Sequence, residues 1–235
     1  MADQRHPQQP AQGSSPSEPE RDARADQPGT TGDAGDAGDE ARRDVFIAAA
    51  RLLAYPDRAL WMLLPAIEAR LRELPASDAL AQLVTVAQRL RATGAAELET
   101  HYVATFDFNE ATSLYLTEHE LGDSRRRGQA LVELRTMLRA SGFEEVTEEL
   151  PDYLPLLLEF LAYAPADTSL DALERRLAAV CERISAKLDA DNLYRAVFVA
   201  LCGVLPAPEE SNPERRFTQR EQADTGEMPY PLQYE

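Results

Sequence analysis

The sequence predicts an all-α protein, and three observations carry that prediction. Between residues 45 and 205, alanine, leucine, arginine and glutamate dominate, and all four are good helix formers. Apolar residues in this stretch recur at helical spacing, whereas no segment alternates in the period-two pattern of a strand. Glycine is also sparse there. We therefore expect a single globular helical domain of about eight helices.

Four helices are expected in the first half of this domain, each bounded by a cap, a proline or a glycine. Pro65 should kink or break the second helix, because proline removes a backbone donor. Ser77 or Asp78 should cap the third helix, and Gly94 should end it. The expected spans are about 44–53, 60–71, 78–93 and 95–106.

Four more helices are expected in the second half, spanning about 124–141, 152–164, 169–189 and 191–205. Asp152 should cap the second of these. That helix is apolar around nearly its whole circumference, which indicates that it is buried in the middle of the domain. Its exceptions, Asp152, Pro155 and Glu159, fall on one line along the helix. This polar stripe indicates either the floor of a groove or an internal ion pair.

The two ends of the chain differ in composition from the domain. Residues 1–44 contain no valine, isoleucine, leucine, phenylalanine, tyrosine or tryptophan, so they cannot bury enough apolar surface to offset the entropy of ordering. Residues 206–235 are rich in proline and polar residues. We therefore expect a disordered acidic leader (1–44), a helical domain (45–205) and a disordered tail (206–235).

The chain is strongly acidic, with 24 Lys and Arg against 41 Asp and Glu and a formal net charge of −17. Such a chain repels nucleic-acid phosphates and anionic membrane surfaces, so we expect neither as a partner. The sequence shows no secretory signal and no apolar run of ~18 residues, which predicts a cytoplasmic protein without a membrane span. In that compartment, Cys181 and Cys202 are expected to be reduced core thiols.

No sequence motif indicates an enzyme. The chain lacks a G-x-S-x-G motif, a P-loop and a G-x-G-x-x-G motif. The string HELGD, residues His119–Asp123, resembles a degenerate H-E-x-x-H motif and leaves a zinc-dependent hydrolase as an alternative. That motif requires both ligands on one continuous helix face, and Gly122 should end the helix before the second ligand. We therefore expect neither catalysis nor a metal site.

A cluster of arginines at the expected start of a helix is the sharpest local feature. Positive charges in a first turn oppose the helix dipole, so carboxylates or an anionic ligand must offset them. Asp152, Glu159 or the pair Glu144–Glu145 could supply those carboxylates. The expected anion or ion-pair cluster consists of Asp123, Ser124, Arg125, Arg126 and Arg127.

Three motifs in order carry a family resemblance: LLAYPD (Leu52–Asp57), HYVATFDFNEATSLYLTEHELGDSRRRGQAL (His101–Leu131) and ELPDYLPLLLEF (Glu149–Phe160). Over about residues 45–205 the chain resembles the cytosolic assembly chaperones of respiratory nitrate reductase. These are also called the delta subunit, and they are related to the proofreading chaperones of twin-arginine signal peptides. The matching positions are Phe106, Asp107, Phe108, Leu116, Thr117, His119, Gly122–Gly128, Glu149–Pro155 and Glu159.

The resemblance implies a chaperone of nitrate respiration and assimilation that binds an unfinished client protein. The client is the apo catalytic (alpha) subunit of nitrate reductase, including its N-terminal peptide. The chaperone keeps it competent for insertion of the molybdenum bis-guanine-dinucleotide cofactor and an iron–sulfur cluster, and delays docking on the membrane subunits. No cofactor is bound stoichiometrically by the chaperone itself. Cofactor-delivery proteins are further candidate partners, and the expected state is a monomer or weak dimer.

An acidic helical domain with an apolar floor helix suits a short amphipathic peptide that carries positive charge. Aromatic and leucine side chains would supply apolar contact, and aspartate and glutamate would supply complementary charge. The candidate peptide-binding residues are Phe106, Asp107, Tyr115, His119, Asp152, Tyr153, Leu154, Leu157 and Glu159.

Two further hypotheses remain open from the sequence. The alternative function is a cofactor-handling protein that binds the guanine nucleotide of the molybdenum cofactor at Arg125–Arg127. In the tail, the segment Met228–Leu232 could fold back onto the peptide groove as a weak pseudo-ligand.

Overall fold

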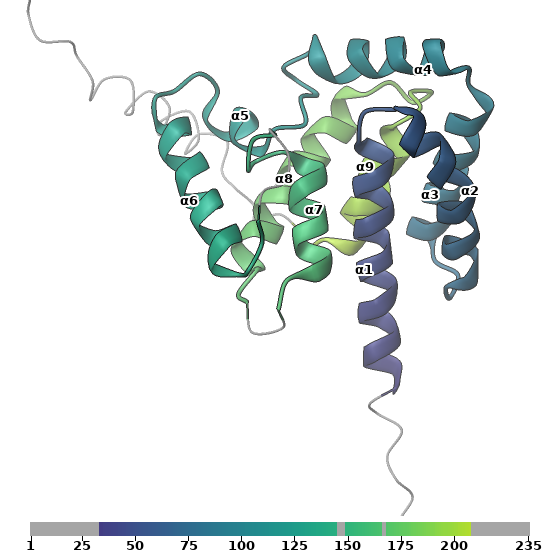
Figure 1. Cartoon of the computed structure of the whole chain (residues 1–235), viewed down its shortest axis with the longest axis horizontal. Helices are drawn as coiled ribbons and strands as arrows, with labels where there is room; N and C mark the ends of the chain where they lie inside the picture. Colours follow the sequence, from purple (N-terminus) through teal and green to yellow (C-terminus); the bar gives the residue numbers. More distant parts are fainter. Residues whose placement is uncertain (1–32, 145–148, 166–167, 208–235) are drawn as a thin grey trace, which may run out of the picture.

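The structure is a computed structural model that describes residues 33–144, 149–165 and 168–207. Within these ranges it contains nine α-helices, one π-helical turn and no strand (Figure 1). The fold is all-α, as predicted, with one helix beyond the expected eight or so. The rest of the expected leader (1–32) and tail (208–235) lies outside the described residues, as does Met228–Leu232.

The elements follow one another along the chain with short connections. Their bounds are α1 (Asp33–Leu53), α2 (Arg58–Glu73), α3 (Asp78–Ala92), α4 (Ala95–Tyr102), the π-helical turn η1 (Val103–Asp107), α5 (Leu116–Leu121), α6 (Arg126–Ala140), α7 (Leu154–Tyr163), α8 (Asp171–Lys187) and α9 (Arg195–Val204). No helix in the described ranges is both long enough and apolar enough to cross a lipid bilayer.

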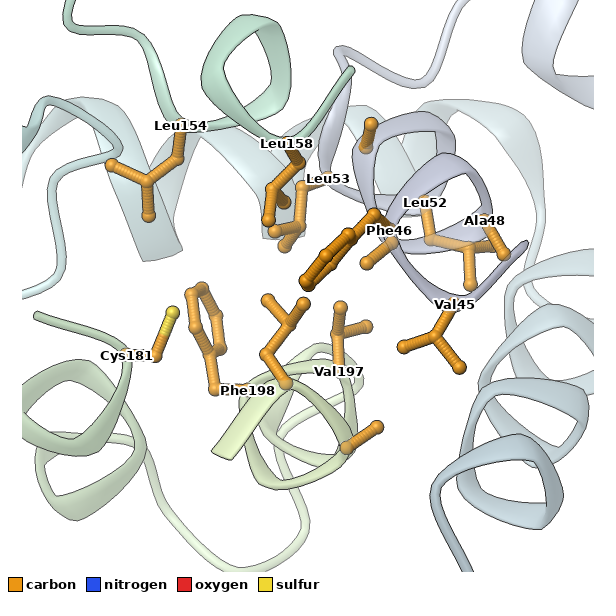
Figure 2. Close-up of a cluster of buried hydrophobic side chains, with 14 of the residues drawn as sticks. Val45, Phe46, Ala48, Leu52, Leu53, Leu154, Leu158, Cys181, Val197 and Phe198 are labelled. Carbon is orange, nitrogen blue, oxygen red and sulfur yellow. The ribbon is translucent and has the colours of Figure 1, made fainter. Parts of the chain in front are cut away.

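The centre of the molecule is α1, which packs against α7 on one side and against α9, α3 and α2 on the others (Figure 1). Figure 2 shows the core where these helices meet: Phe46 and Leu53 of α1 face Val197 and Phe198 of α9 and Leu158 of α7. Each of these five side chains is at most 1% exposed. Burial of one such side chain stabilises the fold by roughly 1.5–3 kcal/mol. Six of the ten residues of α7 are buried, which confirms that the apolar helix lies in the interior.

The first helix is longer than the sequence predicts. It begins at Asp33, so the last part of the expected disordered leader belongs to a helix. Ion pairs hold this extension against the domain: Arg42 contacts Glu174 at 2.7 Å, and Asp44 contacts Arg70 at 2.6 Å. The prediction was wrong here because it counted apolar surface alone, whereas charged side chains reach back from the extension to α8 and α2.

Side-chain caps start α2 and α3. The N–H of Leu60 donates to Asp57 at 2.9 Å, and the N–H of Leu80 donates to Ser77 at 3.3 Å. The expected break at Pro65 does not occur, because α2 continues through this residue on its exposed side. Caps and buried leucines outweigh the one hydrogen bond that proline removes.

The short helix α5 was not predicted. It begins at Leu116 and ends at Gly122, which has a φ of 56°, a value that favours glycine. The cysteines differ from each other: Cys181 is a buried core thiol, but Cys202 is exposed, so the expectation of a second core thiol was wrong. Both thiols are free.

Candidate functional site

An antiparallel bridge joins the loop before α5 to the start of α7. Two backbone hydrogen bonds, of 2.9 and 2.8 Å, connect residues 114–116 to residues 152–154. Tyr115 and Tyr153 pair at the centre of this bridge, and their ring centroids lie 5.5 Å apart. The bridge therefore places two aromatic rings side by side, although they come from distant parts of the sequence.

A cleft of about 250 Å³ opens beside this bridge. Its walls come from four segments: the turn after α1, the end of α4 with η1, the loop before α5, and the segment that leads into α7. We call it the acidic cleft. It is lined by Tyr55, Tyr102, Phe106, Asp107, Leu114, Tyr115, Glu149 and Tyr153.

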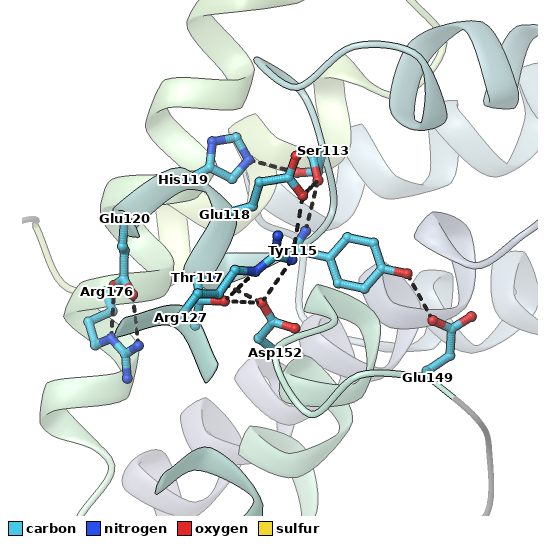
Figure 3. A network of polar contacts seen from close by, with 10 residues as sticks. All are labelled: Ser113, Tyr115, Thr117, Glu118, His119, Glu120, Arg127, Glu149, Asp152 and Arg176. Carbon is cyan, nitrogen blue, oxygen red and sulfur yellow. Dashed lines mark hydrogen bonds and ion pairs between the residues drawn. The ribbon is translucent and has the colours of Figure 1, made fainter. Parts of the chain in front are cut away.

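Hydrogen bonds fix the tyrosines of the acidic cleft. The hydroxyl of Tyr102 donates to the carbonyl of Leu53 at 3.1 Å. Since that proton is used, the hydroxyl of Tyr153 donates to the oxygen of Tyr102 at 3.2 Å. Tyr115 donates to Glu149 at 3.0 Å (Figure 3). Burial raises the pKa of Tyr153 to about 12, so its hydroxyl keeps its proton at neutral pH.

The charge of the acidic cleft is uncompensated. Asp107 and Glu149 are both exposed, and no arginine or lysine is among the lining residues. Partial burial and then the neighbouring charge of Glu149 raise the pKa of Asp107 above its usual value. Two carboxylates among aromatic rings form a site suited to a cation, because both carboxylates and ring faces attract positive charge.

On the other side of the bridge, the acids are enclosed in a network of polar contacts (Figure 3). We call it the sealed network. Asp152 is fully buried, and one of its oxygens accepts hydrogen bonds from the N–H (3.1 Å) and the hydroxyl of Thr117. Arg127 lies 3.9 Å from Asp152 and 3.7 Å from Glu118, and its Nε donates to the hydroxyl of Thr117 at 3.2 Å. Asp152 therefore joins α7 to α5 and α6 rather than facing the acidic cleft.

This contact explains why Asp152 is not a helix cap. The N-cap of α7 is Tyr153, which makes no side-chain cap bond. The predicted cap gives its carboxylate to Thr117, which is distant in sequence. At the far end of the predicted polar stripe, Glu159 pairs with Arg51 at 3.0 Å. The stripe therefore forms ion pairs and is not the floor of the cleft.

Neighbouring acids on α5 are also paired. Glu118 accepts a hydrogen bond from the hydroxyl of Ser113 at 2.8 Å, and Glu120 accepts two from Arg176, both at 2.8 Å. The two-pronged contact between Arg176 and Glu120 ties α5 to α8.

His119 is part of the same enclosed region. Its Nε2–H donates to the carbonyl of Ser113 at 2.7 Å, and burial lowers its pKa below the usual value. The helix ends at Gly122 before Asp123, as predicted, so the two potential zinc ligands do not share a helix face. Across the described part of the chain, no three side chains of metal-binding type gather in one place.

The arginine cluster is committed to its own chain at one of its three guanidinium groups. Arg127 lies between Asp152 and Glu118, which is the ion-pair interpretation of the cluster. Helix α6 has Arg125 at its N-cap position without a side-chain cap bond. The hydroxyl of Ser124 accepts from the N–H of Arg126 at 3.3 Å. None of these contacts favours the nucleotide-handling alternative.

Four of the nine candidate peptide-binding residues line the acidic cleft: Phe106, Asp107, Tyr115 and Tyr153. The other five do not. Leu154 and Leu157 are wholly buried in the core, Asp152 and His119 lie in enclosed polar contacts, and Glu159 lies on an outer turn of α7. Sequence analysis missed four lining residues, of which two stood in the quoted motifs LLAYPD and ELPDY. The missed residues are Tyr55, Tyr102, Leu114 and Glu149.

Comparison with known proteins gives a family. Residues 72–200 match the family described as nitrate reductase delta subunit. The chain belongs to this family. It is 34% identical over 164 residues to the probable nitrate reductase molybdenum cofactor assembly chaperone NarJ of Bacillus subtilis, covering 70% of this chain and 89% of that protein. It is 37% identical over 157 residues to the NarJ chaperone of Escherichia coli K12, covering 65% of each chain.

A solved structure supports the fold of this delta-subunit family member. A redox enzyme maturation protein from Archaeoglobus fulgidus superimposes with a TM-score of 0.52 at 20% identity, covering 68% of this chain and 91% of that one. The resemblance to the assembly chaperones is therefore confirmed. Because the similar NarJ proteins are assembly chaperones and not catalysts, this delta-subunit chain is a chaperone and not an enzyme.

Proposed function

We propose that this protein is a cytoplasmic chaperone dedicated to the apo alpha subunit of respiratory nitrate reductase. The acidic cleft binds the N-terminal peptide of that subunit. While it is bound, the client stays competent for insertion of the molybdenum cofactor and the iron–sulfur cluster, and it does not yet dock on the membrane subunits. The molybdenum bis-guanine-dinucleotide cofactor is cargo for the client rather than a resident group of the chaperone.

The observation that carries this proposal is the uncompensated charge of the acidic cleft. Asp107 and Glu149 face a cavity with aromatic walls and no basic lining residue. The α-amino group or a basic side chain of a peptide would neutralise them, and the tyrosine rings would cover its apolar parts. An acidic partner would be repelled, both here and by the chain's net charge of −17.

The site also suits transient binding. Its rings are held before any ligand arrives, because Tyr102, Tyr115 and Tyr153 are hydrogen-bonded within the chain. Binding therefore does not need to order these side chains. Nothing in the cleft is arranged for a covalent step, so the client can leave unchanged once it is complete.

Co-purification tests the proposal. The full-length chaperone is tagged and isolated from nitrate-respiring cells that make either the complete alpha subunit or one without its N-terminal peptide. We expect the complete subunit to co-purify in its cofactor-free form and the shortened subunit to be lost. Equal recovery of both forms would reject the peptide as the bound segment.

Removal of the chaperone tests the assembly role separately. Cells without it should still make the alpha subunit, but that subunit should lack molybdenum and nitrate reductase activity. Molybdenum content is measured on the isolated alpha subunit, with a plasmid-borne copy of the chaperone as the control. Normal molybdenum content in the deletion strain would reject the assembly function.

A further inference from the structure

A second cleft lies next to the acidic cleft. It has a volume of about 360 Å³ and is mostly apolar. We call it the apolar cleft. It is lined by Tyr55, Glu99, Thr100, Val103, Ala104 and Phe108. Phe108 is 85% exposed, an unusual state for a large aromatic side chain.

The π-helical turn η1 separates the two clefts. Val103 and Ala104 line the apolar cleft, whereas Phe106 and Asp107 line the acidic one. A π-helical turn is wider than an α-helical turn, so five successive residues here face two cavities. Such turns are found frequently at functional sites. Tyr55 lines both clefts and joins them on the opposite side.

We propose that the apolar cleft binds an apolar side chain of the same client peptide whose basic group occupies the acidic cleft. The peptide is thus recognised at two points across the turn. This proposal rests on the proposed function, because it takes the client peptide as the ligand. The occupant is an amphipathic segment that presents a basic and an apolar group on one face.

Continuity and charge both identify this occupant. Because Tyr55 is shared, a chain segment that fills the acidic cleft passes directly over the apolar cleft. The only charged residue in the lining of the apolar cleft is Glu99, so its charge has the same sign as that of its neighbour. A segment with basic groups beside apolar ones fits both clefts, whereas an acidic segment fits neither.

Calorimetry with matched variants tests the proposal. The N-terminal peptide of the alpha subunit is titrated into the full chain and into Phe108→Ser, Asp107→Asn and Val132→Ser variants. Val132 is the control, because it is 60% exposed and lies on α6, away from both clefts (Figure 1). Since Phe108 is so exposed, its substitution should not change the melting temperature. We expect about a tenfold rise in Kd for Phe108→Ser and none for Val132→Ser.

A peptide scan locates the contact. Each apolar peptide residue is changed to alanine and measured against the full chain and against Phe108→Ser. One substitution should weaken binding about tenfold to the full chain and leave binding to Phe108→Ser unchanged. Additive effects at every peptide position would mean that no peptide side chain contacts Phe108, and this would overturn the proposal.

The outcomes separate this proposal from the proposed function. If Phe108→Ser binds like the full chain while Asp107→Asn binds weakly, the apolar contact is rejected and the proposed function stands. If neither variant weakens binding, both are rejected. A full-chain variant with serine at Met228, Tyr230 and Leu232 tests the chain's own tail as the occupant. If this variant binds the peptide more tightly and no longer responds to Phe108→Ser, the apolar cleft belongs to the tail.

Discussion

The Tyr115–Tyr153 bridge separates two acidic regions that differ in one respect. In the sealed network, Asp152 and Glu118 lie close to Arg127 and accept hydrogen bonds from threonine and serine. In the acidic cleft, the two exposed carboxylates have no basic neighbour among the lining residues. The same residue types therefore hold the fold together on one side and remain available to a ligand on the other.

The difference shows how to separate structural from functional acids in such a domain. A buried carboxylate is tolerated only with donors around it, and removing those donors or the acid is costly. An exposed carboxylate beside a second one raises the energy of the free protein slightly, and a cation relieves that cost. Function is therefore expected where the acids are unpaired rather than where they are most deeply buried.

The largest expected effect is on the sealed network. Asp152→Ala leaves the N–H of Thr117 without its acceptor and removes a counter-charge of Arg127. We expect the free energy of unfolding to fall by about 3 kcal/mol. Urea denaturation measures it, and Asp152→Asn, which keeps an acceptor, should lose clearly less. A loss below about 1 kcal/mol for Asp152→Ala would mean that the network does not stabilise the fold.

The acidic cleft should respond in the opposite way. Asp107→Asn removes charge that only a ligand compensates, so peptide Kd should rise about tenfold, or about 1.4 kcal/mol. Because the pKa of Asp107 is raised, its ionised form destabilises the free protein, and the amide should leave the melting temperature equal or slightly higher. Calorimetry and thermal unfolding check the two parts. A clear loss of stability with unchanged Kd would place Asp107 with the structural acids.

The pH dependence of binding sharpens the same contrast. As the pH falls through the raised pKa of Asp107, its carboxylate takes up a proton and loses its attraction for a cation. Peptide affinity should therefore fall between about pH 7 and about pH 5, with proton release on binding near the lower limit. Titrations across this range in Asp107→Asn should give a flatter profile. An identical profile in that variant would assign the titration to another group.

The smallest effect is expected for a paired acid at the surface. Glu120→Gln weakens the two hydrogen bonds to Arg176, and surface ion pairs contribute at most about 1 kcal/mol. We expect a stability loss below that figure and an unchanged peptide Kd. If this variant bound peptide tenfold more weakly, the division between paired and unpaired acids would be wrong.

The sequence predicted the helices well where they are long and amphipathic, because one buried face gives a regular apolar period. It missed α5, since six residues are too few to show that period. It also assigned Asp152 as a cap, the local rule for an acid before a helix. Thr117 lies far away in sequence, and no local pattern reveals that this contact replaces the cap.

The candidate site was predicted in part for a related reason. Motifs identified Asp107 and Tyr153 because these residues carry the family resemblance. Helical periodicity cannot tell a face that borders a cleft from one covered by another helix, so Leu157 was wrongly placed at the surface. Tyr102 was missed because the cleft forms only when α1, α4 and the bridge come together. Such residues become visible only in three dimensions.

Site-specific crosslinking tests the central claim most directly. A photo-reactive phenylalanine replaces either Tyr55, which is 47% exposed and lines both clefts, or Tyr163, which is 52% exposed and lies at the end of α7. After illumination in cells that make the apo alpha subunit, we expect its N-terminal peptide to be crosslinked at position 55 and not at position 163. Crosslinking at position 163 alone, or equally at both positions, would contradict the assignment of the acidic cleft as the client site.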